Sequence, residues 1–191
     1  MRLFVGIFLE VSLREAVRRF CAALSEACPS MSAAVKWVQP ENLHLTLKFL
    51  GTVSAEKLPA LTEALHEAAT VGAFDIALCE FNAFPSLAHP QILWIGVEEG
   101  APYLASLAAS INDRLTERGF PKETRKFAAH VTIGRVRQGY HLSGLAKAAQ
   151  TLKPVKLGRQ HVDAFALIES RLTPRGSLYA LRENIALMPP A

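Results

Sequence analysis

Cysteine and long apolar segments are scarce in this chain of 191 residues. Its three cysteines are odd in number and form no Cys-x-x-Cys pair, so the sequence predicts free thiols in a reducing compartment. No apolar segment approaches the roughly 20 residues that a membrane helix requires. The apolar start, residues 1–9, ends at Glu10 without a cleavage site, which predicts a buried strand and not a signal peptide. We therefore expect a cytoplasmic protein without a membrane association.

The motifs of several enzyme classes are also missing. The chain has no Gly-x-Ser-x-Gly elbow, no Walker A loop and no Gly-x-Gly-x-x-Gly fingerprint. Serine hydrolases of that type, P-loop nucleotidases and dinucleotide enzymes are therefore unsupported. The remaining composition is that of an ordinary globular protein, with 50% hydrophobic and 20% charged residues. A net charge of +4 weakly favours an anionic partner.

One short pattern occurs twice, as His44-Leu45-Thr46-Leu47 and as His130-Val131-Thr132-Ile133. Side chains alternate between the two faces of an extended strand, so the histidine and threonine of each copy point the same way. The apolar residues between them then point into the core. Each copy therefore predicts a strand that buries one face and presents an imidazole and a hydroxyl group on the other.

The alternation continues beyond both copies and fits a half-buried strand better than a helix. It predicts that Lys48 shares the face of His44, while Phe49 lies on the apolar face. In the second copy, Arg135 falls on the face opposite His130, although a bulge at Gly134 could re-aim it. Two such strands lying side by side would place two histidines in one pocket.

The remaining pattern predicts an α+β protein. We expect strands at residues 2–9, 35–38, 74–81, 91–97, 127–135, 162–170 and 178–182, and helices at 11–28, 54–72, 101–118 and 142–151. The two halves, residues 1–86 and 87–191, repeat a similar order of elements around the proline-containing loop 84–90. This repetition predicts one bilobal domain with pseudo-two-fold symmetry. We expect each lobe to carry an antiparallel-type sheet with helices outside, and the active-site cleft to lie between the lobes.

Two imidazoles suit the hydrolysis of a phosphodiester. One can take a proton from water and the other can protonate the leaving oxygen, because the ordinary histidine pKa lies close to neutral pH. Threonine hydroxyls beside them can donate to the phosphoryl oxygens. A strained 2′,3′-cyclic phosphate needs no metal for this chemistry. Neither motif has an adjacent acidic residue or a second histidine at helical spacing, so we expect neither a metal nor a cofactor.

These residues resemble the paired signatures of the two-histidine (2H) phosphoesterases, and most closely the LigT-like RNA 2′,3′-cyclic phosphodiesterases, also called ThpR. The resemblance covers nearly the whole chain. Further segments in the family's order are Arg2-Leu3-Phe4-Val5-Gly6-Ile7, Phe81-Asn82-Ala83-Phe84-Pro85, Ile92-Leu93-Trp94-Ile95-Gly96-Val97 and Ser170-Arg171-Leu172-Thr173-Pro174, followed by Gly176 and Tyr179.

The resemblance implies hydrolysis of a terminal 2′,3′-cyclic phosphate on RNA to a 2′-phosphomonoester. It assigns His44 as the proton donor to the 3′ oxygen and His130 as the acceptor that activates water; the residues themselves leave this assignment open. It places the phosphate on Thr46 and Thr132. The family usually has proline before the second histidine, where this chain has Ala129, and we expect only a local backbone change there.

Five further residues have both a functional and a structural interpretation. Lys48 and Arg135 could contact phosphate, or be solvated basic side chains. Phe49, Phe84 and Trp94 could stack on a nucleobase, or pack in the core.

Three functions are compatible with the sequence. The first is hydrolysis of RNA 3′ ends that carry a cyclic phosphate. The second keeps the fold but takes small cyclic nucleotides, ADP-ribose cyclic phosphate or 2′,5′-linked RNA, with or without an RNA ligase side activity. The third is a non-catalytic RNA-binding module, which the intact histidines and threonines disfavour. We expect a monomer.

Overall fold

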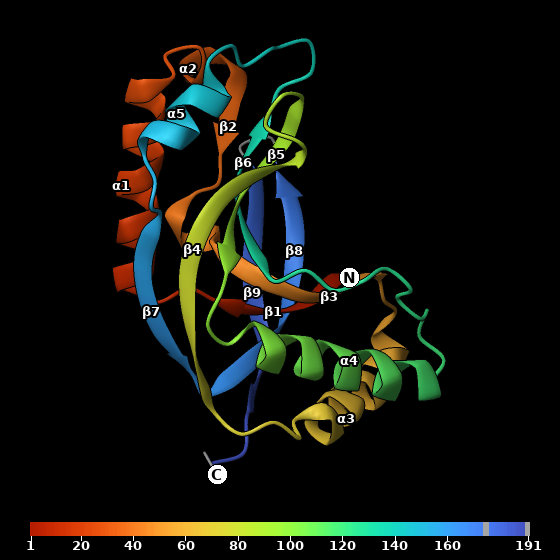
Figure 1. The fold of residues 1–191 in the computed structure, drawn as a ribbon. Helices are drawn as coiled ribbons and strands as arrows, with labels where there is room; N and C mark the ends of the chain where they lie inside the picture. The colour runs from red at the N-terminus through yellow and green to blue at the C-terminus, as the bar shows by residue number, and fades with distance from the viewer. Residues whose placement is uncertain (174–175, 190–191) are drawn as a thin grey trace.

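A computed structural model describes residues 1–173 and 176–189 (Figure 1). Pro174, the last residue of one family-like segment, and Arg175 lie outside the described residues. Among the described residues, no helix has the length and apolar character needed to cross a membrane. The helices are α1 (Val11–Ala27), α2 (Met31–Ala34), α3 (Leu58–Ala68), α4 (Ala101–Glu117) and α5 (Leu145–Thr151), with 3₁₀ turns η1 (Pro40–Asn42) and η2 (Ala55–Lys57).

The predicted α+β class is confirmed. The strands are β1 (Arg2–Phe8), β2 (Val35–Trp37), β3 (His44–Thr52), β4 (Phe74–Pro85), β5 (Pro90–Val97), β6 (His130–Val136), β7 (Lys156–Val162), β8 (Ala164–Thr173) and β9 (Gly176–Ala186). Within the described ranges they form a 9-stranded sheet in the order β7-β4-β5-β6-β3-β1-β8-β9, with β2 paired to β6. All these strand pairs are antiparallel.

The sheet has a weak joint at its centre, where β3 and β6 meet. These two strands pair only through Leu45 and Val131, whereas every other pair along the sheet shares several residues. The joint divides the sheet into two half-sheets, β1-β3-β8-β9 and β2-β4-β5-β6-β7. Each half-sheet has its own helices: α1 packs against β7, and the pair α3 and α4 lies near β3 and β9 (Figure 1). The bilobal prediction is thus confirmed.

The lobes are nevertheless not the consecutive halves 1–86 and 87–191. Strand β4 of the first half pairs with β5 of the second, and β8 of the second half pairs with β1 of the first. The predicted boundary falls inside the hairpin that joins β4 to β5, because β4 continues to Pro85 and β5 begins at Pro90. Alternation along the sequence identifies a strand but does not choose its neighbour, and here each half contributes strands to both lobes.

Strand β7 was not predicted as a separate element. Its exposed residues Lys156, Arg159 and His161 weaken the alternation, since the strand lies at an edge of the sheet. The second motif strand begins at His130 and not at residue 127, so residues 120–129 form an irregular segment.

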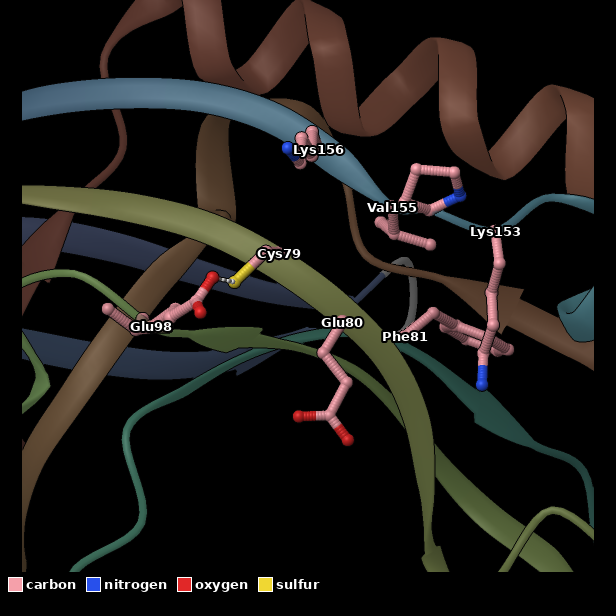
Figure 2. A pocket seen from close by; sticks show the side chains of 9 residues that line it. Cys79, Glu80, Phe81, Glu98, Lys153, Val155 and Lys156 are labelled. Atoms are coloured by element: carbon pink, nitrogen blue, oxygen red, sulfur yellow. Dashed lines mark hydrogen bonds between the residues drawn. The ribbon is translucent and has the colours of Figure 1, made fainter.

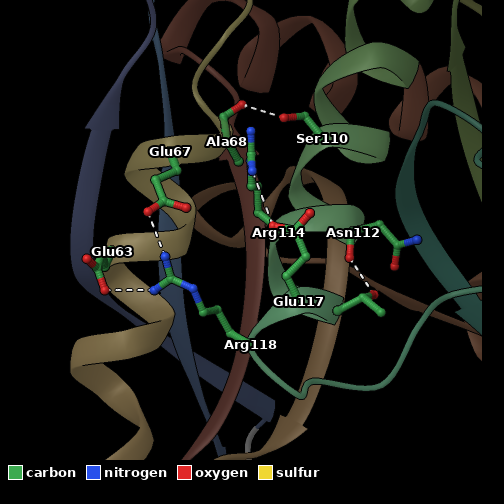
Figure 3. Close-up of polar contacts among 9 residues, drawn as sticks. Glu63, Glu67, Ala68, Ser110, Asn112, Arg114, Glu117 and Arg118 are labelled. Atoms are coloured by element: carbon green, nitrogen blue, oxygen red, sulfur yellow. Dashed lines mark hydrogen bonds and ion pairs between the residues drawn. The ribbon is translucent and has the colours of Figure 1, made fainter.

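Helices α3 and α4 are joined by packing and by polar contacts (Figure 3). The Arg118 guanidinium, just after α4, donates to Glu63 at 2.7 Å and to Glu67 at 2.6 Å, both on α3. The Ser110 hydroxyl donates to the Ala68 carbonyl at 3.0 Å. Because the acidic partners are exposed, each ion pair contributes only about 0–1 kcal/mol. Burial of the apolar faces of both helices therefore dominates this interface.

Two groups of buried side chains lie on opposite faces of the sheet. The large core lies between the sheet and the helices and contains Leu45 and Val131. A small cluster of Phe4, Ala166 and Ile168, with Phe8 and Tyr179 at its margin, lies on the other face. This second face carries the two motif histidines, and we call it the catalytic face.

Candidate active site

The two motifs meet at the joint between the half-sheets. Leu45 and Val131 are paired and fully buried, as the alternation predicts. Extending this antiparallel register by one residue in each direction places His44 opposite Thr132, and Thr46 opposite His130. All four side chains are half-buried on the catalytic face. The two histidines are thus diagonal neighbours, and each faces the threonine of the other motif.

Both imidazoles are held by the same backbone contact. His44 Nδ1 lies 2.6 Å from the Asn42 carbonyl oxygen, and His130 Nδ1 lies 2.8 Å from that of Ala128. A carbonyl oxygen can only accept, so Nδ1 carries the proton in both rings. Each Nε2 is therefore left for the substrate, as acceptor in the neutral ring and as donor in the charged one. The contact at Ala128 is made although alanine occupies position 129.

A bulge in β3 changes the faces predicted for the residues after Thr46. Thr46 pairs with Gly6, but the next pair is Lys48 with Val5, which leaves Leu47 as an extra residue. The following pair is Phe49 with Phe4. The bulge therefore places Phe49 on the catalytic face, where it is 65% exposed, and turns Lys48 to the core side, where it is 6% exposed. The predicted faces of both residues were wrong.

Lys48 serves a structural purpose in this position. Its ammonium donates to Asn112 Oδ1 at 2.6 Å and to the Pro121 carbonyl at 2.9 Å. Asn112 Oδ1 also accepts from the Glu123 backbone N–H at 2.8 Å. Burial lowers the pKa of Lys48, and the charge of Glu123 opposes this shift. Lys48 thus anchors the irregular segment that leads to the second motif, and this placement removes it from the candidate phosphate contacts.

Strand β6 contains a bulge at the equivalent place. Thr132 pairs with Trp94, and the next pair is Gly134 with Leu93, which leaves Ile133 as the extra residue. Arg135 then pairs with Ile92. Directly paired antiparallel residues share a face, and so the bulge brings Arg135 to the face of Thr132 and His130. Arg135 is therefore re-aimed as the sequence allowed, but the bulged residue is Ile133 and not the expected Gly134.

Aromatic rings surround His44. The ring of Phe4 lies 4.8 Å from the imidazole, that of Tyr179 lies 5.2 Å away edge-on, and that of Phe8 lies 6.3 Å away. Burial among them is the main cause that lowers the pKa of His44 below its ordinary value of 6.5. The hydrogen bond to Asn42 opposes the shift, and the charge of His130 adds to it. At neutral pH the free protein therefore holds His44 neutral, and an anion beside it would favour the charged form.

A second aromatic group lies beside His130. Phe84 and Trp94 are stacked with ring centres 5.0 Å apart, and both meet the imidazole edge-on, at 5.4 and 6.0 Å. Phe84 is 37% exposed, whereas the indole N–H of Trp94 is buried and has no hydrogen-bond partner among the described residues. Phe84 therefore presents an open ring surface, and Trp94 lies behind it.

A cavity of about 490 Å³ has neither motif histidine in its lining (Figure 2). It lies between β4, β5 and the start of β7, and its lining carries Glu80, Glu98, Lys153 and Lys156. Glu80 has a left-handed backbone, with φ of 64°. Its carboxylate points away from β7 (Figure 2) and lies 3.6 Å from the place where a side chain of Gly96 would begin. Because Gly96 pairs with His130, Glu80 brings negative charge to this end of the catalytic face.

Metal ligands are not gathered at the site. Within residues 1–173 and 176–189, no group of three or more His, Cys, Asp or Glu side chains is arranged to hold a metal ion. The three cysteines are free thiols in the structure. Cys79 contacts Glu98 at 3.4 Å, and burial raises the pKa of its thiol.

This geometry defines a phosphoesterase with two histidines, and comparison with known proteins agrees. The family model of LigT-like phosphoesterases matches the chain twice, at residues 7–94 and 95–179. The chain belongs to this family, which confirms the resemblance stated above. The duplicated match also explains why the two motifs have the same bulge and the same histidine contact.

The similarity to known relatives extends over almost the whole chain. It is 38% identical to the RNA 2′,3′-cyclic phosphodiesterase of Archaeoglobus fulgidus over 94% of its length and 96% of the relative's. It is 32% identical to the RNA 2′,3′-cyclic phosphodiesterase of Aquifex aeolicus, over 98% of its own length and 97% of the relative's. Among solved structures, TT0787 of Thermus thermophilus superimposes with a TM-score of 0.80 at 27% identity, covering 99% of both chains. LigT of E. coli complexed with 3′-AMP gives 0.75 at 26% identity, covering 97% of both.

Sequence reasoning did not single out Phe4, Phe8, Tyr179 or Glu80 as site residues. The first three look like ordinary alternating strand residues, and only strand pairing brings them to His44: Phe8 is its direct partner across β1 and β3, and Phe4 and Tyr179 come from β1 and β9. A non-glycine residue with positive φ cannot be read from the sequence, so Glu80 gave no signal.

Proposed function

We propose that this protein hydrolyses terminal 2′,3′-cyclic phosphates of RNA to 2′-phosphomonoesters, without a metal. Its relatives are named RNA 2′,3′-cyclic phosphodiesterases, which supports this class of substrate. The observation that carries the proposal is the shared orientation of His44 and His130. Both rings hold their Nδ1 proton on a backbone carbonyl and leave Nε2 for the substrate, on opposite sides of one joint.

The two proton transfers divide between the rings. His130 Nε2 accepts a proton from a water molecule as its oxygen attacks phosphorus. His44 Nε2, in its charged form, donates a proton to O3′ as the P–O3′ bond breaks. The products are a 3′-hydroxyl and a 2′-phosphate, and the two imidazoles end with exchanged protonation states. The assignment of acid and base follows the family pattern. Because the pKa of His44 is lowered in the free protein, the negative charge of the bound substrate phosphate must raise it again for the ring to be protonated.

The phosphoryl oxygens need donors while negative charge builds on them. Thr46 and Thr132 lie opposite the two histidines and supply hydroxyl groups. Arg135 shares their face and adds a permanent positive charge that can bind two oxygens at once. Lys48 has no part in this site, because its ammonium is bonded on the other side of the sheet.

The nucleobase can stack on exposed aromatic rings. Phe49 and Phe84 offer such rings on either side of the joint, and Trp94 supports Phe84 from behind. Stacking on an aromatic side chain contributes about 1–3 kcal/mol per base and tolerates any base. This supports RNA ends, or small cyclic phosphate nucleotides, as substrates without strict sequence preference.

The test is product analysis on an RNA oligonucleotide that ends in a 2′,3′-cyclic phosphate, with EDTA present. We expect a 2′-phosphate from the wild type and a roughly thousandfold lower rate from His44→Ala and from His130→Ala, as the loss of a general acid or base would cause. A 3′-phosphate would reverse the leaving group and contradict the assigned geometry. Activity that EDTA abolishes would contradict the metal-free mechanism. The control His66→Ala removes an exposed histidine from α3, on the helical side of the sheet, and should leave the rate unchanged.

A second candidate function keeps the chemistry and changes the substrate. The histidines, threonines and exposed rings described above need only one cyclic phosphate and one base, which favours small cyclic phosphodiesters as an alternative to RNA ends. If the oligonucleotide is not hydrolysed, 2′,3′-cyclic AMP, ADP-ribose cyclic phosphate and 2′,5′-linked RNA are the next substrates. RNA binding by the wild type with no turnover of any of these would leave only a binding role.

A further inference from the structure

Strand β2 adds a second basic residue to the catalytic face. This short strand pairs with β6 beyond the point where β3 leaves it, and Lys36 pairs directly with Arg135. Since directly paired antiparallel residues share a face, Lys36 lies beside Arg135 on the face that carries His130 and Thr132. Lys36 is exposed, while its neighbours Val35 and Trp37 turn toward the other side of the sheet.

The position of Lys36 is fixed by close packing of β2 against Gly134. A side chain at Gly134 would begin 2.9 Å from Val35 and 3.0 Å from Trp37, so only glycine allows this approach. Backbone bonds extend the pairing on both sides: the Val38 N–H donates to Ile133 at 2.9 Å, and the Arg137 N–H donates to Ala34 at 2.8 Å. Lys36 therefore occupies a defined place in the sheet.

Two like charges in direct cross-strand register repel each other, and such pairs are destabilising. Neither Lys36 nor Arg135 forms an ion pair with any residue in the described part of the chain. An anion bound between the two side chains would relieve the repulsion. This arrangement is a feature expected of a ligand site and costs stability without one.

The opposite end of the catalytic face has the opposite charge. Glu80 lies over Gly96, which pairs with His130, while Lys36 and Arg135 lie at the far end of β6. The backbone of an RNA strand whose 3′ end lies at the histidines is therefore repelled at the Glu80 end of the catalytic face and attracted at the Lys36 end. The partners of Thr132 and Arg135 on β5, Trp94 and Ile92, are two residues apart, which corresponds to about 7 Å along the β-strand. This distance is comparable with the separation of successive phosphates in single-stranded RNA.

We infer that Lys36 binds the phosphate that precedes the terminal cyclic phosphate, so that the enzyme prefers oligonucleotide ends to cyclic mononucleotides. The inference rests on the proposed function. Arg135 is shared between the two phosphates, whereas Lys36 contacts only the second one. Its effect is therefore confined to substrates that carry a second phosphate.

The test compares kcat/KM for 2′,3′-cyclic AMP with that for an ApA dinucleotide ending in a cyclic phosphate. We expect Lys36→Ala to lower the value for the dinucleotide about tenfold, as the loss of one charge-assisted contact would, and to leave the mononucleotide within about twofold. The logarithmic salt dependence for the dinucleotide should weaken by about 0.7, the slope of one phosphate contact on a single strand. Lys36→Arg should retain the preference.

Lys147→Ala is the matched control, since it removes an exposed lysine from α5 on the helical side of the molecule. It should leave kcat/KM unchanged for both substrates. Equal losses on both substrates with Lys36→Ala, or no loss on either, would overturn the inference.

Binding separates this inference from the proposed function. In the His130→Ala background, Lys36→Ala should weaken binding of the dinucleotide about tenfold, again the loss of one charge-assisted contact, and leave the mononucleotide unchanged. If the wild type hydrolyses neither compound, the proposed function fails, and the ratio of these affinities still decides the role of Lys36. An unchanged ratio would reject the second phosphate site.

Discussion

Phe49 and Arg135 occupy equivalent positions in the two motif strands, each brought to the catalytic face by a bulge immediately after the motif threonine. One is an exposed aromatic ring and the other a cation. The duplicated backbone thus presents the same histidine and threonine on both sides of the joint but different chemistry beside them. A substrate with an apolar base on one side and phosphate on the other matches this asymmetry.

The two residues should therefore fail in different ways when truncated. We expect Phe49→Ala to raise KM for cyclic mononucleotides about tenfold, because a stacking surface is lost, and to leave inorganic phosphate binding unchanged. We expect Arg135→Ala to weaken inorganic phosphate binding by a similar factor. Calorimetric titration with phosphate and steady-state kinetics check this pair. Equal effects of both variants on phosphate binding would argue against the division.

The pH dependence should reflect the low pKa of His44. Because kcat/KM reports the free enzyme, one of the two pKa values in its pH profile should be that of His44 and should lie below 6.5. Bound phosphate stabilises the charged ring, so the corresponding limb of kcat should lie at higher pH. NMR titration of the imidazole provides the direct measurement: phosphate should raise the pKa of His44, and so should His130→Ala, which removes a repelling charge. A pKa that does not respond to phosphate would contradict the acid role.

The same shift also makes folding stability depend on pH. A histidine with a lowered pKa in the folded state binds protons more readily when unfolded. Its contribution to stability is therefore fully present above pH 6.5 and is lost as the pH falls from 6.5 through the lower folded pKa. We expect the free energy of unfolding of His44→Gln to fall less between pH 7 and pH 5 than that of the wild type. Urea denaturation at the two pH values tests this, and an identical loss in both proteins would refute it.

Lys48 should matter for stability more than for phosphate. Lys48→Met keeps the apolar stem but leaves the Pro121 carbonyl without its donor and Asn112 with one contact fewer. We expect a loss of about 2 kcal/mol in the free energy of unfolding, measured with urea. Lys122→Met, an exposed lysine in the same segment, is the control and should change stability by less than about 0.5 kcal/mol. A raised phosphate dissociation constant with unchanged stability would restore Lys48 as a ligand.

Glu80 should be destabilising where it lies. Its left-handed backbone conformation costs about 1–2 kcal/mol for a residue with a side chain. Glycine removes this strain but adds an entropic cost of its own, about 0.5–1 kcal/mol. Glu80→Gly should therefore raise the free energy of unfolding by about 0.5–1 kcal/mol. Glu80→Ala removes the same carboxylate but keeps the strain, so it should bring no gain. Equal stabilisation by both variants would assign the effect to charge instead of backbone strain.

The motif geometry could be read from the chain because it is local. Alternation along a strand is a property of covalent geometry, so Leu45 and Val131 were predicted to be buried and the histidines to be open to substrate. The faces of Lys48 and Phe49 could not be predicted in the same way. Each depends on the extra residue Leu47, which exists only in relation to the pairing with β1.

The strand character of both motifs, the four groups that they present and the membership of the family all follow from the order of the amino acids. The identity of neighbouring strands emerges only when the chain folds: the crossing of the two halves at β4 and β8, the pairing of Lys36 with Arg135, and the place of Glu80 near His130. The physical reason is that alternation and burial are set within a few residues. Register between strands is set by the packing of segments that are far apart in the chain.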